Sequence, residues 1–147
     1  MAESIERETQ HLSQRASAIL ELLTADSKNR DNHRRRVSAQ TSDLGRMWQA
    51  HLESLEVASD FIVSKDYHFA SFLRQFQRDA NAVMHLFDHL CSAELPEDDP
   101  DRQDSHVLRV REVLSEALRL LSREQATVIP LVRRWRSTRP MPAAHAS

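Results

Sequence analysis

Residues 29–93 read NRDNHRRRVSAQTSDLGRMWQAHLESLEVASDFIVSKDYHFASFLRQFQRDANAVMHLFDHLCSA, a segment with no proline and a single glycine, Gly45. Apolar residues recur along it at steps of three, four or seven, which is the spacing of one face of an α-helix. The members of this stripe are Val37, Leu44, Trp48, Leu52, Leu55, Ile62, Phe69, Leu73, Phe76, Val83, Phe87 and Leu90. Because such a stripe has to be buried, we expect the shorter elements on either side to cover it.

Whether this segment is one helix or two decides the fold, and its weakest point is Val63-Ser64-Lys65-Asp66-Tyr67. Ser64 or Asp66 could cap a new helix after a sharp turn. However, neither Gly nor Pro marks the site, and tight helical hairpins usually use such residues. We therefore predict one continuous helix over about 30–93, which would be about 95 Å long at the ordinary helical rise. The alternative is an up-down four-helix bundle whose chain reverses near Asp66.

A shorter amphipathic helix is predicted before this segment, over about residues 3–25. Its apolar positions step by seven, four, three and four, which is a heptad seam: Ile5, Leu12, Ala16, Ile19 and Leu23. Residues 26–32 contain no apolar side chain. Asp, Ser and Asn there favour turns and helix caps, so the chain is expected to break before the long helix begins.

A last helix is predicted over about 105–136, and it carries the most regular heptad pattern in the chain. Residues 94–101 hold two prolines and five acids and should form an exposed loop, after which Asp104 or Ser105 can cap the helix. Steps of three and four then follow, with Glu124 at the one polar position of the series. The apolar members are Val107, Val110, Leu114, Ala117, Leu121, Val128, Leu131 and Trp135. Pro130 is expected to bend or end the helix near Val128.

These elements define an all-α fold, an antiparallel helical bundle in a single domain over residues 1–136. A chain of 147 residues is long enough to bury one sizeable core. One glycine in the whole chain suits helices rather than sheets, which need more turns. Residues 137–147 have no periodicity and are expected to form a disordered tail.

Charge and composition exclude several classes of partner. The net charge is -2 and the pI is about 6.4, so there is no overall positive field to attract nucleic acid or an anionic membrane. The densest basic run, residues 34–36, has no interleaved aromatic residues and is interpreted as a solvated helix face. The single cysteine, Cys91, and the lack of a signal-peptide pattern favour a reducing compartment, so we expect a cytoplasmic protein.

Two stretches of the long segment resemble the spectrin-repeat family. Residues 44–49, LGRMWQ, are similar to the leucine-to-tryptophan spacing of the family's third helix, and residues 72–80, FLRQFQRDA, to the opening of its first helix. The acidic loop and residues 110–114 then resemble the passage into a second helix. The likeness covers about residues 30–136. It implies two incomplete repeats joined by one long helix, and the family's roles in cytoskeletal spacing, scaffolding or partner docking.

The sequence departs from the family pattern at two places. Leu86 and Phe87 stand where the first helix of a spectrin repeat usually has a tryptophan. The distance from Trp48 to Phe76 is also a few residues longer than the family spacing. Both departures bear on the resemblance to the family.

No constellation of residues in the sequence predicts catalysis. His85 and His89 are four apart, a spacing that can chelate a metal on one helix face, and Asp88 lies between them. A di-iron bundle would also need Glu-x-x-His pairs on two helices, and none is present. His89 and Cys91 point in different directions on a helix and do not form a catalytic pair. We therefore expect no catalytic residue, no metal and no cofactor.

The resulting functional hypothesis is a non-enzymatic module for protein interaction or scaffolding. A continuous long helix would leave an open apolar groove at each end, to be filled by a second copy of the chain or by a helix of another protein. The side chains expected to bind that partner are Trp48, Leu52, Leu55, Leu121, Val128 and Trp135. The alternative is a helical sensor or a ligand- or metal-binding bundle that uses the histidines.

Overall fold

The computed structural model describes the backbone of residues 2–24, 30–92 and 100–137, and the side chains of 4–24, 33–90 and 104–135. Over these residues the chain forms four α-helices and one 3₁₀-helix, and it contains no strand. They are α1 (Ala2–Thr24), α2 (Arg30–Lys65), η1 (Tyr67–Phe69), α3 (Ala70–Ser92) and α4 (Pro100–Ser137). The predicted all-α helical bundle is thus confirmed.

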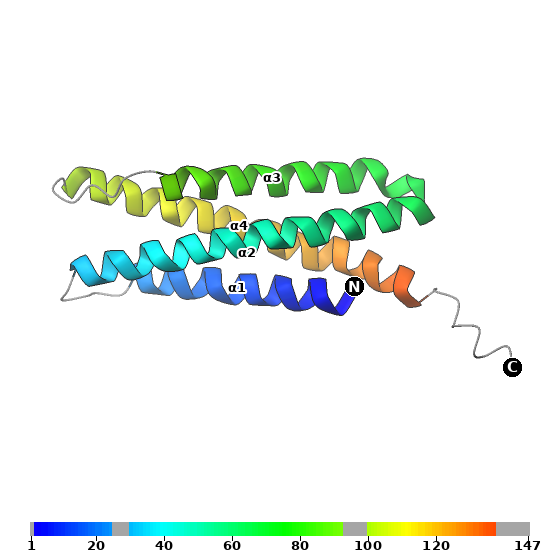
Figure 1. Ribbon diagram of the computed structural model, residues 1–147, viewed down its shortest axis with the longest axis horizontal. Coiled ribbons are helices and arrows are strands. Elements are labelled where there is room, and N and C mark those ends of the chain that lie inside the picture. The colour runs from blue at the N-terminus through cyan, green and yellow to red at the C-terminus, as the bar shows by residue number, and fades with distance from the viewer. Residues whose placement is uncertain (1, 25–29, 93–99, 138–147) are drawn as a thin grey trace, which may run out of the picture.

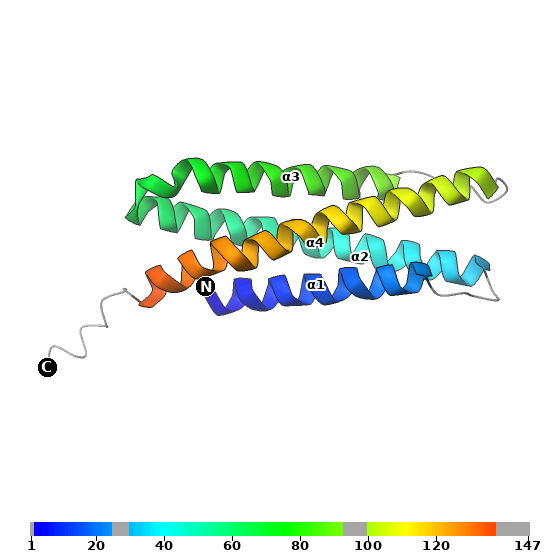
Figure 2. The same ribbon diagram turned by 180° about the vertical axis from the view of Figure 1, so that it is seen from behind.

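The four helices run alternately up and down in one bundle (Figures 1 and 2). α2 and α4 lie between α1 and α3, on opposite faces of the bundle, and each packs against both of them. α4 crosses the bundle obliquely, from the end of α3 toward the start of α1. This order of helices is the up-down arrangement in which short connections join antiparallel neighbours.

The predicted continuous helix over residues 30–93 is wrong, because the chain reverses at Asp66. Asp66 has an extended backbone (φ -149°, ψ 103°), and its carboxylate accepts a hydrogen bond of 3.0 Å from the backbone N–H of His68. The N–H of Asp66 still bonds the Ile62 carbonyl at 2.8 Å and so closes α2. One aspartate therefore ends one helix and caps the next, a task for which Asp is well suited without any glycine or proline.

α4 also differs from the predicted helix over 105–136. It begins at Pro100, not at a cap on Asp104 or Ser105. Proline suits the first helical position, where its missing N–H would have no helical partner and its fixed φ is already helical. At the other end, α4 continues through Pro130 to Ser137, so this proline does not end the helix.

Pro130 is tolerated because it lies on the wet face of α4. Its ring is exposed, and so is Ala126, whose carbonyl loses its helical N–H partner to the proline. Water can bond that carbonyl, while Val128 and Ile129 remain in the core on the opposite face. Beyond Ser137, the predicted tail lies outside the described residues.

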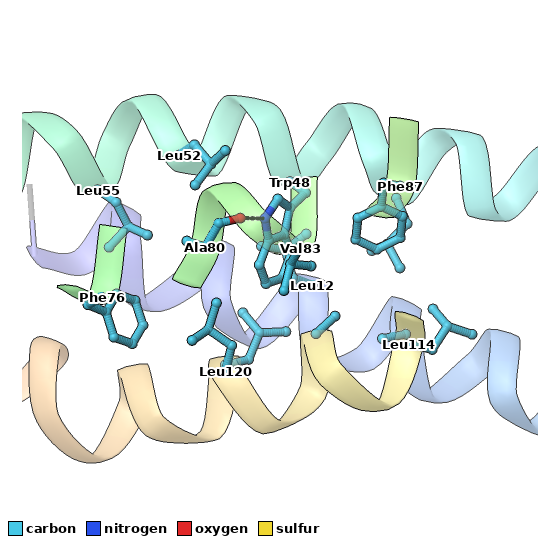
Figure 3. Packing of buried hydrophobic residues seen from close by; sticks show 14 of the residues in the cluster. Leu12, Trp48, Leu52, Leu55, Phe76, Ala80, Val83, Phe87, Leu114 and Leu120 are labelled. Carbon is cyan, nitrogen blue, oxygen red and sulfur yellow. Dashed lines mark hydrogen bonds between the residues drawn. The ribbon is translucent and has the colours of Figure 1, made fainter. Parts of the chain in front are cut away.

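All four helices contribute to one apolar core, part of which is drawn in Figure 3. Trp48 belongs to the apolar stripe that was expected to be buried, and it lies in the core: it is 2% exposed, and its indole Nε1 donates a hydrogen bond of 3.0 Å to the Ala80 carbonyl of α3. Its ring centroid lies 5.9 Å from that of Phe87. The other large, fully buried side chains are Phe76, Ile5, Leu12, Ile19, Leu44, Leu55, Ile62, Leu73, Leu114 and Leu121.

No helix in the described part of the chain has the length and apolar character needed to cross a membrane.

Candidate functional site

The first notable site is a cluster of polar side chains inside the core, which we call the His51 cluster. It consists of Thr9 and Glu8 from α1, His51 and Ser54 from α2, and Glu124 from α4. Thr9, His51 and Glu124 are all at most 2% exposed. Each of these three occupies an apolar stripe of its helix, so the helices bring polar side chains together at one level of the core.

His51 is held at both ring nitrogens by carboxylates. Nδ1 lies 2.8 Å from Oε2 of Glu8, and Nε2 lies 2.6 and 2.9 Å from the two carboxylate oxygens of Glu124. Two hydroxyls also contact the carboxylates. The Thr9 hydroxyl lies 2.7 Å from Glu124 Oε1 and 2.8 Å from the Ile5 carbonyl, which share its one proton, and the Ser54 hydroxyl donates to Glu8 Oε1 at 2.9 Å. The cluster thus joins three helices through hydrogen bonds to charged groups, which are stronger than neutral ones.

With both carboxylates ionised, the two contacts of the His51 ring call for a proton on each ring nitrogen. A carboxylate only accepts hydrogen bonds, and a neutral imidazole has one N–H, so only the imidazolium can donate to both partners. Burial lowers the pKa of His51, but the hydrogen bond and charge of Glu124, reinforced by those of Glu8, outweigh it and leave the pKa raised above its ordinary value of 6.5. The buried positive charge is therefore compensated on two sides.

This cluster is suited to fastening helices rather than to reacting with a substrate. Both ring nitrogens are occupied and the ring is enclosed, so no atom of His51 faces solvent with a free lone pair or a free proton. Within the described part of the chain, no group of three or more His, Cys, Asp or Glu side chains is arranged to hold a metal ion. His85, Asp88 and His89 are exposed on α3, and the Cys91 side chain lies outside the described residues.

The side chains predicted to bind a partner mostly lie within the bundle. Five of them are buried against the chain's own helices, namely Trp48, Leu52, Leu55, Leu121 and Val128, and Trp135 is partly buried against the same core. The prediction assumed a continuous helix with open grooves at both ends. Since the chain reverses at Asp66, α3 folds back along α2 and these side chains pack internally. Trp48, Leu55, Leu121 and Val128 could reach a partner only if the bundle opened, whereas Leu52 also lines an open groove between α2 and α3. The binding role of all six stays a prediction.

The second notable site is an open groove between α2 and α3, with a volume of about 540 Å³. Its α2 side extends from Gln49 to Val63, which is about 21 Å at the helical rise per residue. The apolar side chains in it are Leu52, Val63, Ala70, Leu73 and Met84. We call it the α2–α3 groove.

The α2 rim of the groove is acidic. Glu53, Glu56 and Asp60 are exposed along it, and none takes part in an ion pair with another described residue. They are spaced by three and four residues, so their like charges repel one another on one helix face. On the α3 side the rim carries Arg74 and Asn81.

One polar atom on the groove lining lacks a hydrogen-bond donor. Gln77 donates through Nε2 to the Leu52 carbonyl at 3.4 Å, whereas its Oε1 has no hydrogen-bond partner among the described residues. A buried acceptor in this state raises the free energy of the fold.

Sequence reasoning missed both sites for different reasons. The signal for the His51 cluster was present, because Glu124 interrupts an apolar heptad series and Thr9 lies between Ile5 and Leu12 on their stripe. Nothing in the sequence indicated that these positions meet His51. The α2–α3 groove was invisible because it exists only after the chain reverses at Asp66.

The fold places this chain among antiparallel four-helix bundles. Comparison with protein-family models, curated proteins and solved structures gives no match. Membership of the spectrin-repeat family therefore stays a prediction, and the long shared helix that it implied is absent from the described residues.

Proposed function

We propose that this chain is a non-enzymatic protein-interaction module that docks a basic amphipathic helix of another protein in the α2–α3 groove. The observation that carries the proposal is the pairing of an apolar groove lining with an unpaired acidic rim on the described surface. An amphipathic helix binds such a groove through apolar residues at steps of three and four. A cytoplasmic scaffold is the setting that the composition favours.

Charge complementarity selects the occupant. Glu53, Glu56 and Asp60 repel one another, and each like-charged pair three or four apart costs about 0.2–0.5 kcal/mol. Lys or Arg side chains along one edge of a docked helix would pair with these carboxylates and so remove their repulsion.

The length of the groove matches this kind of ligand. About 21 Å corresponds to roughly four helical turns, enough for three or four apolar anchors on one face. A second copy of this chain is a less suitable occupant, because its apolar stripes are already buried in its own core. The prediction of self-association depended on open grooves at the ends of a continuous helix. The chain reverses instead, so this reason for self-association no longer applies.

The test uses a synthetic, fluorescently labelled helix of Leu and Lys, with leucines at helical spacing on one face. Binding is followed by anisotropy, and a peptide of the same composition with scrambled order is the negative probe. Replacing Glu53, Glu56 and Asp60 together by Gln, Gln and Asn should weaken binding about tenfold, at ~0.5 kcal/mol for each exposed ion pair.

A matched variant separates the rim from general charge attraction. Asp104, Glu112 and Glu116 are exposed on α4, so neutralising them changes the net charge by the same amount away from the groove. We expect that variant to bind like the wild type. Ser59→Trp, which fills the groove without changing the charge, should abolish binding. Equal weakening by both triple variants, or full binding by Ser59→Trp, would refute docking in this groove.

A further inference from the structure

The polar contacts of α1 with the rest of the bundle converge on the His51 cluster. Glu8 contacts His51 and Ser54 of α2, and Thr9 contacts Glu124 of α4. A further ion pair, Glu6 with Arg133 of α4, lies at the surface and is largely exposed on the arginine side. Surface pairs of this kind contribute little, so the buried cluster dominates the polar attachment of α1.

Removing one proton from His51 breaks one of the two contacts of its ring with the carboxylates. The neutral ring has one N–H and one bare nitrogen, and the bare nitrogen then faces a carboxylate at hydrogen-bond distance. Two lone pairs oppose each other in the core, and the Glu8 and Glu124 carboxylates lose the positive charge between them. A buried network that is only partly satisfied is less favourable than one that is complete.

We propose that His51 is a proton-controlled latch, which fastens α1 to α2 and α4 when protonated and loosens α1 when it loses the proton. The proposal rests on a buried ring that bridges carboxylates from two other helices. Glu8, on α1, is about one-third exposed, with side-chain exposure of 32%, so it can turn out to water. Glu124 is 2% exposed and stays in the core. α1 is therefore the helix that is loosened when the contact is broken.

The direction of the pH response follows from the raised pKa of His51. The protonated ring stabilises the folded bundle fully below its unfolded pKa of 6.5, and this stabilisation is lost as the pH rises through the higher folded pKa. Between these two values, the opening equilibrium changes by about tenfold per pH unit for one proton. The latch is therefore closed below pH 6.5 and opens as the pH rises through the folded pKa of His51.

His106, a second histidine whose pKa is displaced, does not reverse this direction. The charged groups that act on the ring are Glu8 from α1 and Glu124 from α4. On α4, His106 has its pKa lowered by burial and by the charge of Arg109, so it destabilises the fold as the pH falls below 6.5. This effect has the opposite sign and lies in a lower pH range.

Amide hydrogen exchange tests the latch on the whole chain between pH 6 and pH 9. Intrinsic exchange accelerates equally for all helices, so the readout is the protection of α1 amides relative to α3 amides at each pH. We expect this ratio to fall with rising pH in the wild type. In His51→Gln it should be independent of pH, and in Glu8→Gln the fall should be smaller.

His85→Gln is the matched control, because His85 is an exposed histidine on α3 outside the cluster. It should retain the wild-type response. A constant α1-to-α3 ratio, an equal loss in both helices, or an unchanged response in His51→Gln would overturn the latch. Should His51→Gln fail to fold, an NMR titration of the wild-type ring decides the matter: a pKa at or below 6.5 contradicts the proposal. Neither result bears on binding in the α2–α3 groove, which is measured with the synthetic helix.

Discussion

Trp48 is the side chain on which the fold depends most at the scale of single residues. Its ring fills the space between α2 and α3, and its indole N–H is paired with the Ala80 carbonyl. Trp48→Ala should lower the free energy of unfolding by about 3–5 kcal/mol, the usual loss for a buried aromatic side chain. Urea denaturation followed by circular dichroism measures this change.

Trp48→Phe shows whether packing or the hydrogen bond matters more, and Tyr67→Ala serves as an exposed control. Trp48→Phe keeps most of the ring volume and loses the indole donor, so we expect a smaller loss than with alanine, of about 1–2 kcal/mol. Tyr67→Ala, at a side chain that is 75% exposed, should change stability by less than about 0.5 kcal/mol. A loss below about 1 kcal/mol for Trp48→Ala would contradict its role as an anchor.

The sequence predicted apolar residues of the core better than polar ones. The burial of Trp48 and Leu114 can be predicted from helical spacing alone, because an apolar stripe on a helix is buried in the core. His51 and Glu124 do not, since a polar residue on a stripe pairs only when two helices have the right rotation and register. That information lies in the packing of three helices and not in the local pattern of any one.

At the scale of elements, Asp66 shows why the break in the long segment was missed. The absence of Gly and Pro from residues 46–93 argued for continuity. Yet a residue that adopts an extended conformation and accepts a hydrogen bond from the next turn is sufficient to reverse the chain. Asp66 was recognised as a possible cap. However, the reversal is stabilised by the burial of α3 against the other helices, and local sequence signals do not measure that burial.

Gly45 provides a test of helix packing where α2 faces α3. It is buried, and a Cβ built there would lie 3.5 Å from Phe87 Cβ, an ordinary van der Waals distance. Gly45→Ala should therefore raise the free energy of unfolding by about 0.5–1 kcal/mol through helix propensity. Urea midpoints of the two proteins provide the comparison. A clear loss of stability would mean that α3 packs more closely on α2 at this point.

At the scale of the whole molecule, the reversal at Asp66 determines which surfaces are available to partners. With a continuous helix, the apolar stripes would remain half covered and would favour association of two chains. With α3 folded back on α2, the stripes are buried and the exposed feature is the α2–α3 groove with its acidic rim. The helical class was predictable from periodicity, whereas this surface depends on a single change of chain direction.

The distance between Gln49 and Asn81 tests that change of direction most directly. Both side chains line the α2–α3 groove. Spin labels are attached to cysteines at these two positions, with Cys91 replaced by serine. Double electron–electron resonance then measures the distance between the two labels. Neighbouring helices have axes about 8–10 Å apart, so we predict a short distance, within about 20 Å between labels.

Dilution with unlabelled chain shows whether that short distance arises within one molecule. In the four-helix bundle both labels belong to one chain, so dilution should leave the short distance unchanged. A distance near 48 Å, the length of 32 residues in one straight helix at about 1.5 Å per residue, would contradict the four-helix bundle. A short distance that disappears on dilution would contradict it equally, since the two labels would then belong to different chains.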